Sequence, residues 1–133
     1  MAQFISNITL LVNDYDEAID YYTNTLGFTL LCDVPVTSEQ RWVRVLPPGQ
    51  TLQHAGTALV LAKASSIQQA LVGKQAGAEV LLFLQSDNFW QDYQQMLAAG
   101  VNFLEQPREE VYATVVVFAD LYGNRWDLLQ PKP

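Results

Sequence analysis

His54 and Cys32 are candidates for chemistry. Each is the only residue of its type in the chain. A single histidine excludes sites that take two histidines from one chain, such as the two-histidine, one-carboxylate iron site or the three-histidine zinc site. His54 falls in a loop, residues 50–56, where a histidine is typically a solvated surface residue. Cys32 has no basic residue close in sequence to activate it and no partner for a disulfide within the chain. We therefore expect Cys32 to be a small buried residue rather than a nucleophile.

Composition and charge exclude several classes of protein. The chain has 133 residues, of which 50% are hydrophobic and 16% are charged, and its net charge is -7. Such an apolar chain folds, and its acidity makes nucleic acid or an anionic membrane an unlikely partner. The negative surface either favours a cationic ligand or serves solubility alone. The longest apolar runs, 80–84 and 115–119, are far shorter than the ~20 residues that span a bilayer. With one cysteine and no leader-like opening, we expect a cytoplasmic protein.

The elements that must position a site begin with a strand over residues 4–12. A helix follows from Tyr15, where Asp14 and Glu17 form a capping pattern, and Gly27 stops it. Three further apolar runs, 28–34, 41–46 and 57–62, predict strands. The first half is therefore β-α-β-β-β.

The second half repeats this order of elements. A strand over 79–85 precedes a helix from Phe89, Gly100 stops that helix, and strands follow over 101–104, 112–118 and 125–130. Placing Asn13-Asp14 on Asp87-Asn88 gives an offset of 74 residues, which predicts an internal repeat. The alternative is two unrelated segments that share a common alternation of strand and helix. The repeat predicts one domain, 1–133, made of modules 1–64 and 76–133 with a linker over 65–75. Each module has too little core to stand alone.

Three parts of the chain carry a resemblance to a known family. They are the opening Asn7-Ile8-Thr9-Leu10-Leu11-Val12-Asn13-Asp14, the pair Tyr21-Tyr22 with Leu26-Gly27-Phe28, and the closing segment Phe118-Ala119-Asp120-Leu121-Tyr122-Gly123-Asn124-Arg125-Trp126-Asp127-Leu128. In these parts the chain resembles the vicinal oxygen chelate superfamily, which contains glyoxalase I, extradiol dioxygenases, fosfomycin resistance enzymes and bleomycin-binding proteins. The resemblance implies an α+β fold of two βαβββ modules whose mixed sheets curl into a cup, as in the glyoxalase-like fold. It also implies a homodimer.

The resemblance further implies four metal-binding positions, which this sequence fills with Asn7, Val60, Leu81 and Asp127. Val60 and Leu81 have hydrocarbon side chains without lone pairs, so two of the four positions cannot bind a metal. A divalent metal held by one carboxylate and one amide would bind weakly and stay largely hydrated. We therefore expect no metal and no other cofactor, with a weakly held divalent metal at Asp127 as the alternative.

The alternation of side chains along a strand then selects the residues that would line the cup. They are Asn7, Thr9, Trp42, Arg44, Phe83, Gln85 and Asp127, and they form a mostly apolar and aromatic wall with a few orienting polar groups. Arg44 would bind a carbonyl or carboxylate of a ligand, or pair with Asp127 if the ligand is cationic. The alternative is that Trp42 belongs to the core and that Arg44 points to solvent.

Two functions fit these residues. The first is a metal-free binding module of the bleomycin-resistance type, in which a homodimer holds a small organic ligand in the cup. The second is a metal-dependent glyoxalase-like lyase or dioxygenase that uses Asp127.

Overall fold

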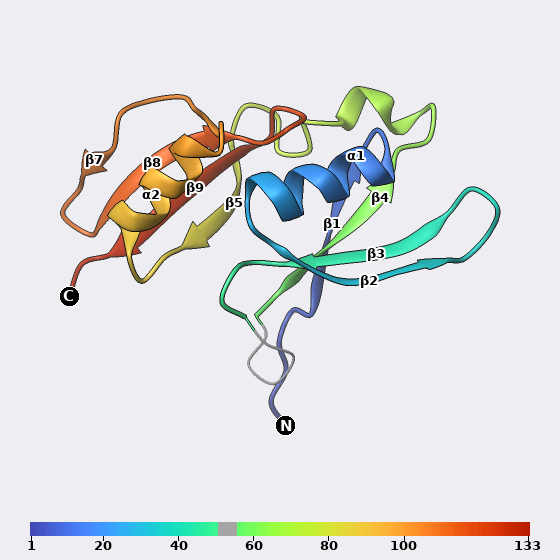
Figure 1. Ribbon diagram of the computed structural model, residues 1–133, viewed down its shortest axis with the longest axis horizontal. Coiled ribbons are helices and arrows are strands. Elements are labelled where there is room, and N and C mark those ends of the chain that lie inside the picture. Colours follow the sequence, from blue (N-terminus) through green and yellow to red (C-terminus); the bar gives the residue numbers. More distant parts are fainter. Residues whose placement is uncertain (51–55) are drawn as a thin grey trace. The chain divides into compact units, whose positions relative to one another are not determined.

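A computed structural model shows two compact units, Met1–Val72 and Gly73–Pro133, and each unit is built from strands and helices (Figure 1). The structure describes residues 1–50 and 56–133, so the prediction that His54 is a solvated loop residue lies outside the described residues. The two units carry an α+β fold with two open mixed sheets, which confirms the predicted fold class. None of the helices in the described ranges is long and apolar enough to cross a membrane.

The first unit holds a four-stranded sheet in the order β1-β4-β3-β2. Its elements are β1 (Asn7–Val12), α1 (Tyr15–Asp20), the π-helix η1 (Tyr21–Thr25), β2 (Thr29–Pro35), β3 (Arg41–Leu46), β4 (Ala58–Lys63) and the 3₁₀-helix η2 (Gln68–Leu71). Strands β1 and β4 are parallel, and the other pairs are antiparallel. The predicted cap is present, since Asp14 accepts a hydrogen bond of 2.9 Å from the backbone N–H of Glu17.

The end of the first helix differs from the prediction of a regular helix up to Gly27. The hydroxyl of Thr23 donates to the carbonyl of Ile19 at 2.7 Å, and the backbone N–H of Leu26 donates to the carbonyl of Tyr21 at 3.1 Å. A threonine hydroxyl that occupies a helical carbonyl competes with the regular backbone ladder, so this turn widens into the π-helix η1. Gly27, with a φ of 75°, then ends the helix as predicted.

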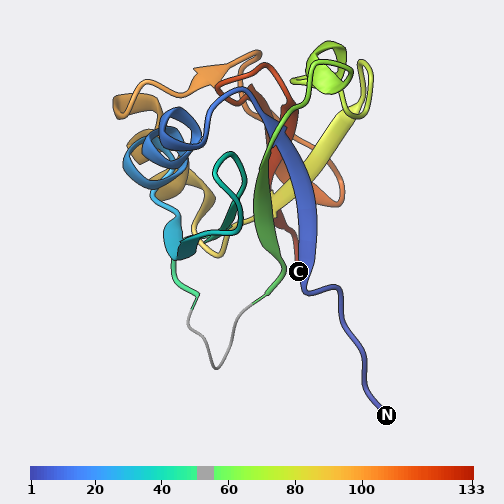
Figure 2. The same ribbon diagram turned by 90° about the vertical axis from the view of Figure 1, so that its right-hand side faces the viewer.

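The core of the first unit lies between α1 and one face of its sheet (Figure 1). Five aliphatic side chains on that face are fully buried: Leu10, Val12, Val43, Val45 and Leu61. Ile8, which the alternation places with Leu10 and Val12, is exposed because it lies at the opposite end of β1 from the helix. Residues 1–6 run on from that end of β1 away from the sheet (Figure 2).

The second unit holds a five-stranded sheet in the order β5-β9-β8-β6, with β7 also paired to β8. Its elements are β5 (Val80–Gln85), α2 (Phe89–Ala98), β6 (Asn102–Phe103), β7 (Arg108–Glu109), β8 (Ala113–Ala119) and β9 (Arg125–Pro131). Strand β7 was not predicted, because two charged residues show neither apolar character nor alternation. Helix α2 packs against β9 (Figure 1), and Phe118, Trp126 and Leu128 are buried in this unit.

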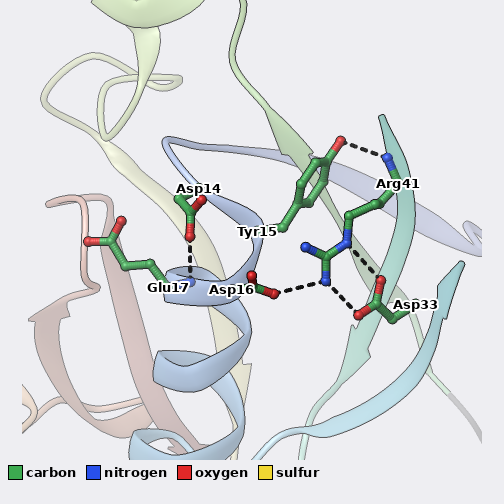
Figure 3. Close-up of polar contacts among 6 residues, drawn as sticks. All are labelled: Asp14, Tyr15, Asp16, Glu17, Asp33 and Arg41. Atoms are coloured by element: carbon green, nitrogen blue, oxygen red, sulfur yellow. Dashed lines mark hydrogen bonds and ion pairs between the residues drawn. The ribbon is translucent and has the colours of Figure 1, made fainter. Parts of the chain in front are cut away.

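A polar cluster joins α1 to the β2–β3 hairpin in the first unit. Arg41 forms a two-pronged ion pair with Asp33, with N–O distances of 2.6 and 3.0 Å, and a second ion pair of 3.0 Å with Asp16 (Figure 3). Its guanidinium lies 5.0 Å from the ring centre of Tyr15, whose hydroxyl accepts a hydrogen bond from the Arg41 backbone N–H. Arg41 thus points to the helix side of the sheet. Because side chains alternate along a strand, this determines to which side of the sheet each remaining residue of β3 points.

The stability of the first unit should depend on pH through Asp33. The hydrogen bond from Arg41 lowers the pKa of Asp33, so the pair stabilises the fold above the pKa of an unfolded aspartate and this stabilisation is lost as the pH falls through the lower folded value. We expect Asp33→Asn to reduce the free energy of unfolding by up to about 1 kcal/mol at pH 7, because the pair is half-exposed, and to leave it unchanged near pH 2. Urea unfolding across this pH range measures the difference.

A matched control is available in the same hairpin. Glu39 is an exposed carboxylate, so Glu39→Gln should change the stability at neither pH. An equal loss in the Asp33→Asn variant at pH 7 and pH 2 would mean that the ion pair is not the cause.

Candidate functional site

The face of the first sheet that lies opposite α1, here called the first open face, carries a row of paired residues across all four strands. Thr9 pairs with Val60, Val60 pairs with Arg44, and Arg44 pairs with Cys32. Directly paired residues on neighbouring strands point to the same side of a sheet. Trp42, two residues before Arg44, shares this face and is 41% exposed. Trp42 is therefore not part of the core between the sheet and α1.

Arg44 lies near the centre of the first open face. Its Nε donates to the amide oxygen of Asn7 at 2.9 Å, and the Nδ2 of Asn7 donates to the hydroxyl of Ser6 at 3.1 Å. The two side chains are half-buried. Their contact joins residues that are 37 positions apart in the chain. The structure thus brings together two predicted site residues on neighbouring parts of one face.

The corresponding face of the second sheet, opposite α2, is here called the second open face. Asp127 on β9 lies between Phe83 on β5 and Val117 on β8. Phe83 is 66% exposed, and Gln85 is exposed two residues further along β5. Trp126 and Leu128, the neighbours of Asp127 along β9, point the other way and are buried under α2.

The carboxylate of Asp127 is incompletely satisfied. Its Oδ1 is buried and has no hydrogen-bond partner among the described residues. Burial raises the pKa of Asp127, the nearby guanidinium of Arg108 opposes this rise, and the carboxylate of Glu105 adds to it. Glu105 itself accepts hydrogen bonds from Arg108 Nε at 3.0 Å and from the backbone N–H of Val117 at 3.1 Å. This face therefore holds an acceptor that a hydrogen-bond donor can satisfy.

The four positions that the resemblance links to a metal do not fit a divalent cation. In the first unit, the amide oxygen of Asn7 already accepts from the cationic guanidinium of Arg44, and Val60 offers no donor atom. In the second unit, Leu81 is hydrocarbon and falls at an irregularity of the β5–β9 ladder, and the residue paired with Asp127 is Phe83. Among residues 1–50 and 56–133, no three His, Cys, Asp or Glu side chains are grouped to hold a metal ion.

The predicted site residues fall into two groups, one in each unit. Asn7, Thr9, Trp42 and Arg44 share the first open face, and Phe83, Gln85 and Asp127 share the second. Three residues of these faces were missed. Cys32, expected to be buried, is half-buried beside Arg44, because a register shift between Leu30 and Cys32 turns it to this face. Glu105 and Arg108 come from an irregular segment whose spacing gives no signal in the sequence.

Comparison with known proteins gives consistent matches over nearly the whole chain. The model of the Glyoxalase/Bleomycin resistance protein/Dioxygenase superfamily matches residues 4–128. An uncharacterized protein of Shewanella frigidimarina (strain NCIMB 400) is 51% identical over 132 residues, which are 98% of this chain and 95% of that protein. Among solved structures, UcmS2 has a TM-score of 0.80 at 29% identity and covers 97% of this chain and 98% of its own. TnmS3, an antibiotic binding protein from Streptomyces sp. CB03234, has a TM-score of 0.78 at 28% identity and covers 98% of both chains.

Proposed function

The chain belongs to the Glyoxalase/Bleomycin resistance protein/Dioxygenase superfamily, and from this premise we propose that it binds a small organic ligand on the open faces of its sheets without a metal. We propose further that it acts as a cytoplasmic homodimer.

The observation that carries this proposal is the make-up of the two open faces. Each combines an exposed aromatic side chain with a charged group that lacks a full set of partners: Trp42 with Arg44 on the first face, and Phe83 with Asp127 on the second. Apolar surface with a small number of polar groups that fix orientation is typical of sites for small organic molecules. A core that merely supported the sheets would not place large aromatic rings on the side away from the helices.

The likeness to TnmS3 supports the same function, since that protein binds an antibiotic and matches this chain over its full length. The competing function, a metal-dependent lyase or dioxygenase, rests on Asp127 alone. The Asn7 oxygen is engaged by Arg44, and Val60 and Leu81 are hydrocarbon, so a metal would find one carboxylate and otherwise water. The binding function is therefore preferred.

Native mass spectrometry of the purified protein, with and without a mixture of organic compounds, tests the proposal. We expect the mass of a dimer, no stoichiometric zinc, nickel, manganese or iron, and at least one retained organic ligand. Trp42→Ala should weaken binding of that ligand about three- to tenfold because an aromatic stacking partner is lost, while the fold survives. Trp90→Ala is the matched control, since Trp90 is a similarly exposed tryptophan of α2 and lies on neither open face.

Two results would contradict the proposal. About one divalent metal per chain, lost in Asp127→Ala, would support the enzyme instead. Equal losses of affinity in the Trp42→Ala and Trp90→Ala variants would remove the first open face from the binding site.

A further inference from the structure

Arg44 has no carboxylate partner among the described residues, and neither has Arg125, which is exposed and donates to the backbone carbonyl of Ala78. Arg41 and Arg108 pair with carboxylates, whereas Arg44 donates to the neutral amide of Asn7. Within the described ranges, no salt bridge involves Arg44. A guanidinium has five N–H donors, and the contact with Asn7 uses the one on Nε, so neither terminal amino group of Arg44 has a hydrogen-bond partner among the described residues. These two groups form the end of the fork that binds a carboxylate through two parallel hydrogen bonds.

The first open face supplies no acidic side chain to this fork. The row of paired residues through Arg44 consists of Thr9, Val60 and Cys32, none of which has a carboxylate. A half-buried cation without a counter-ion is costly, and an anion from outside removes this cost. Trp42 lies on the same face two residues away and is partly exposed, so a flat apolar group attached to the anion can stack beside the fork.

The sequence alone leaves Arg44 either to a ligand or to Asp127. The structure gives the carboxylate of Asp127 its own nearby cation, Arg108, within the second unit. Arg44 is held by Asn7 within the first unit. Among the described residues of its own unit, Arg44 therefore has no carboxylate partner, and a ligand can supply its counter-charge.

We propose that the first open face selects a planar organic anion, such as an aromatic carboxylate, and that Arg44 is the residue that determines this preference. The inference rests on the proposed function, to which it adds the chemical class of the ligand. Arg44 binds the anionic group through its terminal amino groups, Asn7 positions the guanidinium, and Trp42 contacts the flat part.

Cys32 offers a direct test, because it is the only cysteine of the chain and is the paired neighbour of Arg44 on this face. Iodoacetate is an anion and iodoacetamide is its neutral analogue, so the ratio of their alkylation rates at Cys32 reports the local preference for anions. Accessibility and thiol ionisation affect both reagents alike and cancel in the ratio. Intact-mass kinetics at about 0.15 M salt measure both rates.

We expect the ratio of the iodoacetate rate to the iodoacetamide rate to fall about three- to tenfold in Arg44→Gln relative to the wild type, because a unit charge close to the reacting atom is removed. Arg44→Lys should keep most of the ratio. Lys63→Gln is the matched control: it removes a positive charge from the same unit at an exposed position outside this face, and the ratio should not change. An unchanged ratio in Arg44→Gln would overturn the inference.

A second arm tests the planar part of the proposal. 2-Naphthoate should slow the alkylation of Cys32 by iodoacetamide, acetate at the same concentration should do so less, and 2-naphthylmethylammonium should not. Equal protection by the ammonium compound would overturn the preference for anions. If Cys32 resists both reagents, a Cys32→Ser, Val60→Cys variant moves the reporter to the other paired neighbour of Arg44.

The two proposals fail in different ways. A ratio that depends on Arg44, without any organic ligand in native mass spectrometry, would contradict the proposed function and leave the preference for anions standing. An organic ligand that is retained by Arg44→Gln with unchanged affinity would support the function and contradict the inference.

Discussion

Replacement of Asp120 by alanine is expected to destabilise the protein by about 3 to 5 kcal/mol, because it removes the common acceptor of a buried hydrogen-bond network. Asp120 is 6% exposed and lies in the turn between β8 and β9. Its Oδ1 accepts from the backbone N–H groups of Tyr122 and Asn124 at 3.1 and 3.0 Å. Its Oδ2 accepts from Asn124 Nδ2 at 3.0 Å and from Trp126 Nε1 at 3.2 Å. Alanine leaves these donors without their acceptor in a site that is closed to water.

Chemical denaturation followed by tryptophan fluorescence measures this loss. Asp87→Ala provides the control, since Asp87 is an exposed carboxylate in the turn between β5 and α2 of the same unit, and its removal should cost less than about 0.5 kcal/mol. Asp120→Asn should fall between the two, because an amide keeps one acceptor oxygen but presents N–H groups to the remaining donors. A loss below about 1 kcal/mol in Asp120→Ala would show that the turn relaxes and that water reaches the donors.

The second large effect is expected at Gly73, where alanine should cost about 3 kcal/mol or more. Gly73 has a φ of 75°, and a Cβ atom added there would overlap the carbonyl oxygen of Tyr122 and lie 2.9 Å from its carbonyl carbon. The obstacle is backbone rather than the end of a flexible side chain, so the β8–β9 turn itself must move.

Gly77 allows the two parts of this cost to be separated. It also has a positive φ, 64°, but a Cβ atom added there meets nothing within 4 Å. Gly77→Ala should therefore show only the cost of the left-handed backbone, about 1 kcal/mol. Thermal unfolding of both variants measures the difference. Equal losses at the two glycines would mean that the close approach to Tyr122 contributes nothing.

The faces of the strands were predictable where one side is covered by a helix. Val43 and Val45 are fully buried, and Trp42 lies opposite them, because period-two alternation needs no knowledge of the partner strand. The stops at Gly27 and Gly100 were likewise predictable, since a positive φ favours glycine, and their φ angles are 75° and 90°. Local rules of this kind account for the order of the elements.

The partners within the site were not predictable, because they depend on register between distant strands. The bond from Arg44 to Asn7 joins β3 to β1, which are not even neighbours in the sheet. Cys32 reaches the first open face through a register shift that leaves no mark in an apolar run. The turn between β8 and β9 contains Gly123, which has a positive φ of 95°, but the role of Asp120 as the acceptor that closes this turn was missed.

The isolated cation on the first open face has a kinetic consequence. The chain carries a net charge of -7, so an anion in solution is repelled at long range and attracted only once it is close to Arg44. Salt at about 0.15 M screens interactions beyond about 8 Å, and it weakens the short contact with a half-buried guanidinium much less. We therefore expect the association rate of an anion with this face to increase as salt is added, which is the reverse of the behaviour of an electrostatically steered pair, so that encounters are faster at the ionic strength of a cell than in dilute buffer.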